Sequence, residues 1–68
     1  MKRTQRFERR LDEAREDITG VMKTYIREIE VQKVRRDASR NGFVRTCAQQ
    51  EIDRLTAEKN AIELEIVG

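Results

Sequence analysis

The side chains that could do chemistry in this chain are its charged residues, one cysteine and one tyrosine. The sequence has 15 Lys and Arg, 13 Asp and Glu, and no His. Without histidine the most common general base is missing, and one cysteine is too few for the usual zinc-ligand sets. The sequence also lacks a glycine-rich phosphate loop and a paired nucleophile and base. We therefore expect a protein that is not an enzyme and that binds no cofactor or metal.

The most uneven charge lies just past the middle of the chain. Residues 33–45 carry five basic side chains and one acidic one. Unpaired Lys and Arg release counterions when they meet phosphates, so this segment is the candidate contact for an anionic partner. The candidate residues are Lys33, Arg35, Arg36, Arg40 and Arg45. The alternative is a solvated helix end whose positive charge suits the helix dipole, and the lack of interleaved aromatic residues favours it.

The cysteine and the tyrosine are better explained by packing than by reactivity. Arg45 could lower the pKa of the Cys47 thiol, but Cys47 lies beside an apolar series, where a free cysteine behaves as a small apolar residue. Tyr25 belongs to an apolar series of its own, so we expect a core or oligomer-interface ring. A single cysteine excludes an intramolecular disulfide and favours a reducing compartment.

Apolar residues in the first half of the chain recur at the spacing of a coiled-coil seam. The steps from Phe7 to Tyr25 are four, three, four, three and four, and the seam then widens. Its residues are Phe7, Leu11, Ala14, Ile18, Val21, Met22, Tyr25 and Ile29. Because the periodicity continues on both sides of Gly20, we expect that glycine to be tolerated or closely packed, not to break the helix. The pattern predicts one helix over about residues 3–39.

A second series follows the strongest break in the chain, the dipeptide Asn41-Gly42. Both residues tolerate positive φ, so the pair suits a helix end and a chain reversal. The series consists of Ala48, Ile52, Leu55, Ile62 and Ile66, with Lys59 as its one interruption. We predict a turn at residues 40–43, where Phe43 caps the apolar seam, and a second helix at 44–66.

Two local alternatives stay open in this second half. Thr46 and Gln49 have the spacing of a capping box, which would start the second helix slightly later. Residues 62–66 alternate strictly between apolar and acidic, which is also the pattern of a half-buried strand.

The two series fall on different heptad phases, and two helices folded back on each other remove that conflict. We therefore predict an all-α fold, a coiled-coil-like antiparallel two-helix hairpin that forms a single domain, 1–68. A chain of 68 residues has limited capacity to bury its own apolar surface, so the hairpin is expected to dimerise into a four-helix bundle. The hairpin would also bring its basic N-terminal segment beside the acidic end of the chain. The expected pairing joins Arg6, Arg9 and Arg10 to Glu58, Glu63 and Glu65.

Two functions fit these features. The first is a small interaction protein, an adaptor or inhibitor of a larger protein, which acts through oligomeric helix surfaces. The alternative is a small nucleic-acid-binding regulator that uses the basic turn. The architecture resembles, in shape and size only, plasmid- and phage-encoded helical hairpins such as the Rop-type RNA-binding bundle, and a phage-encoded inhibitor would suit the composition. No run of 18 apolar residues is present, and basic and acidic residues mix along both helices, so we expect a cytoplasmic protein without a membrane partner.

Overall fold

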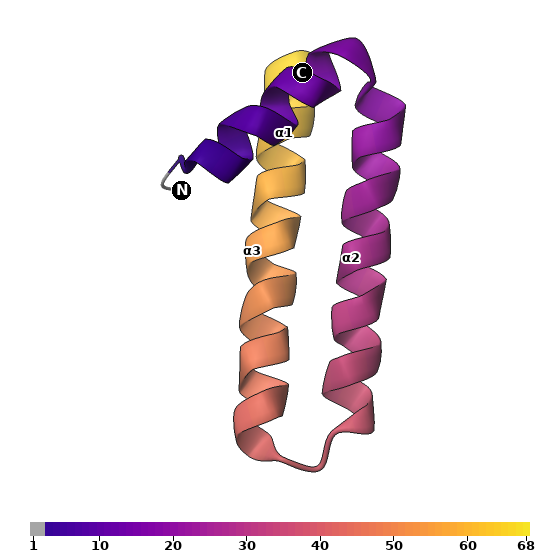
Figure 1. The fold of residues 1–68 in the computed structure, drawn as a ribbon, viewed down its shortest axis with the longest axis vertical. Helices are drawn as coiled ribbons and strands as arrows, with labels where there is room; N and C mark the ends of the chain where they lie inside the picture. Colours follow the sequence, from indigo (N-terminus) through magenta and orange to yellow (C-terminus); the bar gives the residue numbers. More distant parts are fainter. Residues whose placement is uncertain (1–2) are drawn as a thin grey trace.

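Three α-helices make up the protein in the computed structural model, which describes residues 3–68 (Figure 1). Helix α1 spans Gln5–Glu16, α2 spans Ile18–Ala38 and α3 spans Gly42–Ile66. The helices α2 and α3 lie side by side with a turn at one end, and α1 folds back over the other end (Figure 1). The predicted all-α class is therefore confirmed. Residues 1 and 2 of the predicted domain lie outside the described residues.

The first predicted helix is interrupted at Asp17, so the expectation of one helix over residues 3–39 is wrong. Asp17 ends α1 by donating its backbone N–H to the Glu13 carbonyl at 2.9 Å. Its carboxylate also caps α2, because Oδ1 accepts the Gly20 N–H at 3.0 Å. A Cβ at Gly20 would collide with Asp17 Oδ2 and lie 2.9 Å from Cγ. Gly20 therefore leaves room for the cap that divides the helix.

The chain turns close to the predicted place, at residues 39–41 instead of 40–43, and the chemistry of the turn differs from the prediction. Asn41 caps the start of α3, where its Oδ1 accepts the backbone N–H groups of Phe43 at 2.9 Å and Val44 at 3.4 Å. No residue in the range 3–68 has a positive φ. Gly42 is the first residue of α3, so this helix begins two residues before the predicted start, and the capping box at Thr46 does not form its beginning.

The second half of the chain is helical up to Ile66, so the strand alternative for residues 62–66 is wrong. Lys59, which interrupts the second apolar series, is half-buried and places its Nζ 3.4 Å from Glu63 Oε2. A lysine can bury its aliphatic stem while the charged end stays at the surface. The interruption is therefore compatible with a continuous packed helix.

The core lies between the three helices and is built from the two predicted apolar series. Its buried residues are Phe7, Leu11, Ala14, Val21, Tyr25, Leu55 and Ile62, and the half-buried residues packed against them include Ile18, Met22, Ile29 and Ile66. Ala48 and Ile52 are also buried and lie nearer the turn. The first three of these core residues belong to α1. The single chain therefore covers the core between α2 and α3 with its own α1.

We expect Leu55→Ala to lower the free energy of unfolding by about 2–5 kcal/mol, because Leu55 is only 2% exposed and its truncation leaves a cavity. Leu64→Ala is the matched control in the same helix. Leu64 is 72% exposed, so the change there should stay within about 0.5 kcal/mol. Urea unfolding followed by circular dichroism measures both variants.

If Leu55→Ala does not fold, Ile62→Val provides a milder test of the same core, with an expected loss of about 0.5–1.5 kcal/mol. Equal losses at Leu55 and Leu64 would contradict the orientation of α3.

Candidate interaction surfaces

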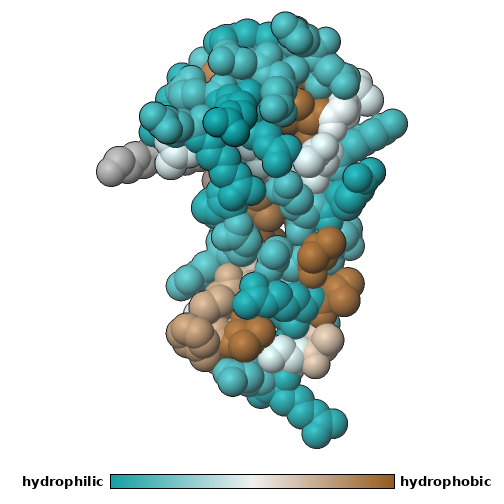
Figure 2. Space-filling model, in the orientation of Figure 1, coloured by the Kyte–Doolittle hydropathy of each residue, from teal (hydrophilic) through white to brown (hydrophobic). Residues whose placement is uncertain are grey.

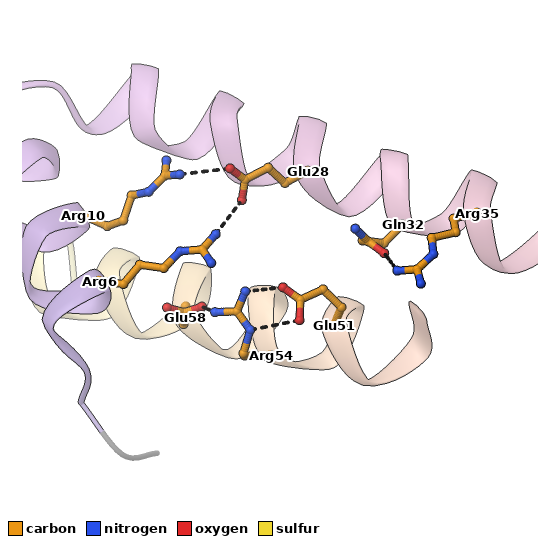
Figure 3. Close-up of polar contacts among 8 residues, drawn as sticks. All are labelled: Arg6, Arg10, Glu28, Gln32, Arg35, Glu51, Arg54 and Glu58. Atoms are coloured by element: carbon orange, nitrogen blue, oxygen red, sulfur yellow. Dashed lines mark hydrogen bonds and ion pairs between the residues drawn. The ribbon is translucent and has the colours of Figure 1, made fainter. Parts of the chain in front are cut away.

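Arginines of the N-terminal segment attach α1 to the other two helices. Arg10 Nη2 lies 2.9 Å from Glu28 Oε1, and Arg6 Nη2 lies 3.8 Å from Glu28 Oε2 (Figure 3). Arg3 Nη2 donates to Glu65 Oε2 at 2.7 Å, and this hydrogen bond raises the pKa of Arg3. The expected pairing of Arg6 and Arg10 with the acidic end of the chain is therefore wrong, because both face α2.

Glu58, which was expected to pair with the N-terminal arginines, is a buried charged side chain and is only 5% exposed. Arg54 bonds both Glu58 and Glu51, and its Nε donates to Glu51 Oε2 at 3.2 Å (Figure 3). The hydrogen bond from Arg54 lowers the pKa of Glu51. A buried carboxylate needs such a partner to offset its lost hydration. The burial of Glu58 could have been predicted from its spacing, because it lies three residues after Leu55 and four before Ile62 on the same face of the helix. Arg54, one turn earlier, has the spacing of its ion-pair partner.

The ring of Tyr25 lies in the core of the single chain, only 2% exposed. The Arg10 guanidinium lies 5.4 Å from the ring centroid, and the tyrosine hydroxyl makes no hydrogen bond within residues 3–68. Burial raises the pKa of Tyr25 to about 12, and the nearby charge of Glu58 acts in the same direction. Tyr25 therefore closes the core and is not available to stack on a ligand.

Two of the predicted anion-binding residues are paired with carboxylates. Lys33 Nζ lies 3.4 Å from Glu30 Oε1, and Arg36 Nε lies 3.0 Å from Asp37 Oδ1. The hydrogen bond from Arg36 lowers the pKa of Asp37. Arg36 also donates to Gln49 Oε1 at 2.6 Å, across to α3. The charges of Lys33 and Arg36 are thus partly compensated on the molecule itself.

The other three predicted residues make no ion pair with any residue in the range 3–68. Arg35 donates to Gln32 Oε1 at 3.3 Å (Figure 3), and Arg45 donates to the Ser39 carbonyl oxygen at 3.3 Å. Arg40 has neither kind of contact among the described residues. The positive charge that remains free at the turn therefore comes from Arg35, Arg40 and Arg45.

Apolar side chains remain exposed in the half of the α2 and α3 pair that lies next to the turn. Val31 is 59% exposed, Val34 66% and Phe43 77%. Figure 2 shows apolar surface over this part of the molecule. We call these three residues, with the half-buried Val44 and Cys47, the turn-side surface. The expectation that Phe43 caps the apolar seam is wrong, because its ring faces solvent.

The turn-side surface is open because α1 crosses the opposite end of the helix pair (Figure 1). With 12 residues α1 extends over about 18 Å, whereas the 25 residues of α3 extend over about 38 Å at 1.5 Å per residue. An open groove of about 220 Å³ lies between α2 and α3. Its lining residues are Arg27, Glu28, Val31, Gln32, Glu51 and Leu55. The helix pair therefore offers both a groove and exposed apolar side chains.

The remaining features to place are the cysteine, the carboxylates and the apolar character of the helices. Cys47 is a half-buried free thiol. Within residues 3–68 no group of three or more Cys, Asp or Glu side chains is arranged to hold a metal ion. None of the three helices combines the length and the apolar character needed to cross a membrane.

Comparison of the chain with protein-family models, curated proteins and solved structures gives no match. The functional proposals below therefore rest on the geometry and charge of this chain.

The chain has one tyrosine, so its ionisation can be followed directly by ultraviolet absorbance. We expect Tyr25 to titrate with a pKa of about 12 in the folded protein and near 10 in concentrated urea. Because the folded state binds this proton more tightly, the stabilisation is present below pH 10 and is lost as the pH rises toward 12. A folded protein whose tyrosine titrates near 10 would contradict the burial of this ring by α1.

Proposed function

We propose that this chain is a non-enzymatic helical interaction protein, an adaptor or inhibitor that binds a larger protein through the turn-side surface. The main support for this proposal is that Val31, Val34 and Phe43 are all exposed in the half of the molecule that α1 leaves uncovered. Exposed apolar residues that gather in one region are typical of protein interaction sites. Burial of each of these side chains against a partner would contribute about 1.5–3 kcal/mol.

The charges around this surface favour a particular kind of partner. Arg35, Arg40 and Arg45 lie at the turn without a carboxylate partner within residues 3–68. An amphipathic helix with acidic residues beside its apolar face would complement both the apolar side chains and these charges. The groove between α2 and α3, lined by Val31 and Leu55 among others, supplies a place for the apolar face of that helix.

The antiparallel hairpin and its dimerisation into a four-helix bundle, both predicted from the sequence, are part of the same proposal. The opposite directions of α2 and α3 on the two sides of the turn in Figure 1 support the antiparallel hairpin. Two copies that met through their turn-side surfaces would bring two such pairs together as a four-helix bundle. Self-association is thus one form that binding through this surface can take.

The double variant Val31→Ser with Phe43→Ser should weaken binding of a protein partner by roughly tenfold or more, because it removes two apolar anchors. The experiment is affinity capture from host extract treated with nuclease, followed by titration of the captured protein. Leu64→Ser is the matched control, since Leu64 is 72% exposed at the opposite end of α3. A partner that binds the double variant as tightly as the unchanged protein would exclude the turn-side surface.

Salt separates this proposal from the nucleic-acid-binding alternative. A complex that rests on several phosphate contacts loses roughly 10³-fold in affinity between about 50 and 200 mM salt, whereas a complex held mainly by apolar side chains, with exposed ion pairs at its edge, loses far less. Nucleic-acid binding also predicts loss of affinity in the double variant Arg35→Ala with Arg36→Ala. We expect no gel shift with duplex DNA or RNA hairpins at low salt, and a shift that these two substitutions abolish would favour the alternative.

A further inference from the structure

We propose that α1 exchanges between two copies of this chain, so that the α1 of each copy covers the α2 and α3 core of the other. In the exchanged dimer α1 and α2 join through Asp17 into one helix over residues 5–38. This inference goes beyond the proposed function, because it concerns the opposite half of the molecule and leaves the turn-side surface free.

The spacing of the apolar residues across Asp17 is the first observation. Phe7, Leu11 and Ala14 on α1 continue to Ile18, Val21 and Tyr25 on α2 without a change in the alternating steps of four and three. Two helices separated by a sharp turn need no common register. A register that passes through the break is required only when the two segments form one straight helix, whose apolar residues then make one stripe.

The junction itself is the second observation. A single residue, Asp17, separates α1 from α2, and its backbone lies at φ −148° and ψ 76°. No proline and no positive φ fixes the bend there. In a continuous helix the Gly20 N–H would return from the Asp17 carboxylate to the Glu16 carbonyl. Short junctions between packed elements favour domain exchange, because the bend is relieved when the chain straightens.

The contacts of α1 are the third observation. They show which helix fits the site on α2 and α3, namely the α1 of this chain or of a second copy. The site that receives α1 is formed by Tyr25, Leu55 and Ile62, with Glu28 and Glu65 at its edge. A second copy presents the same site. The α1 helix of another copy is therefore complementary to it in shape and in charge. Exchange preserves these contacts, so the junction and the protein concentration decide between the closed chain and the dimer.

The substitution Gly20→Ala tests the junction. A Cβ at this position displaces the Asp17 cap, which only the closed chain uses, whereas Gly20 is helical in both forms. Loss of such a cap corresponds to about a fivefold preference for the continuous helix. A dimer contains two junctions, each without its cap, so its association constant should rise roughly 25-fold. Sedimentation equilibrium over a range of concentrations measures this. Gly42→Ala is the matched control, because nothing lies within 4 Å of a Cβ there, and it should leave the constant unchanged.

A second variant should act in the opposite direction. Insertion of Gly-Ser-Gly between Asp17 and Ile18 prevents the continuous helix and lets α1 close on its own chain without strain. We expect this variant to stay monomeric, with its helical content retained. A dimer that is as stable with the insertion as without it would overturn the exchange.

Cross-linking identifies the exchanged contact directly. The ends of the Arg3 and Glu65 side chains pair at 2.7 Å, so Arg3→Cys is placed in one chain and Glu65→Cys in another, both with Cys47→Ser. After the two are mixed, a short bismaleimide that spans the length of the two original side chains is added, and exchange predicts a cross-link between the two different chains in excess over each homodimeric cross-link. The same mixture carrying the Gly-Ser-Gly insertion should lose this excess.

Two results would overturn the exchange and leave the proposed function standing. The first is a chain that remains monomeric at all concentrations, with and without Gly20→Ala, yet still binds a partner that Val31→Ser with Phe43→Ser releases. The second is a dimer that this double variant dissociates while Gly20→Ala leaves its association constant unchanged, because such a dimer forms through the turn-side surface.

Discussion

The packing of α1 against α2 and α3 is the interaction on which the rest of this structure depends. Burial of Phe7 and Leu11 contributes on the order of 1.5–3 kcal/mol each, whereas an exposed ion pair contributes about 0–1 kcal/mol. Apolar burial therefore determines that α1 closes over the core. The contacts of Arg10 with Glu28 and of Arg3 with Glu65 then select the place on the helix pair where it settles.

The apolar series and the turn could be predicted because each follows from a local requirement. A buried stripe must recur every three or four residues, and every seam residue named from the sequence is buried or half-buried in the structure. The interruption at Asp17 could not be predicted in this way. A helix cap at Asp17 contributes only about 1 kcal/mol to stability, so local preferences do not decide whether the helix ends there. The contacts of Phe7 and Leu11, ten and six residues earlier, decide it. Local pattern contains no information about those contacts.

The ion pairs differ in the same way, because those within one helix could be predicted from spacing and those between helices could not. The Glu51, Arg54 and Glu58 set lies within about two helical turns, so its spacing could have indicated the pairing. Glu28 is 18 residues from Arg10, and their contact exists only because α1 folds back at Asp17. An antiparallel hairpin with a straight first helix sends the N-terminal arginines to the wrong carboxylates. One error at the junction is therefore enough to misplace both ion pairs of Glu28.

The helix α2 carries exposed apolar residues in addition to the apolar residues that it buries. Tyr25 faces the core, whereas Val34 lies nine residues later and so about half a turn around the helix at roughly 100° per residue. Val31 is three residues before Val34 and lies beside it, at the edge of the groove between α2 and α3. A helix that only had to cover α3 would carry polar residues there. Because α1 lies over the opposite end of the helix pair (Figure 1), these two valines stay exposed in the single chain.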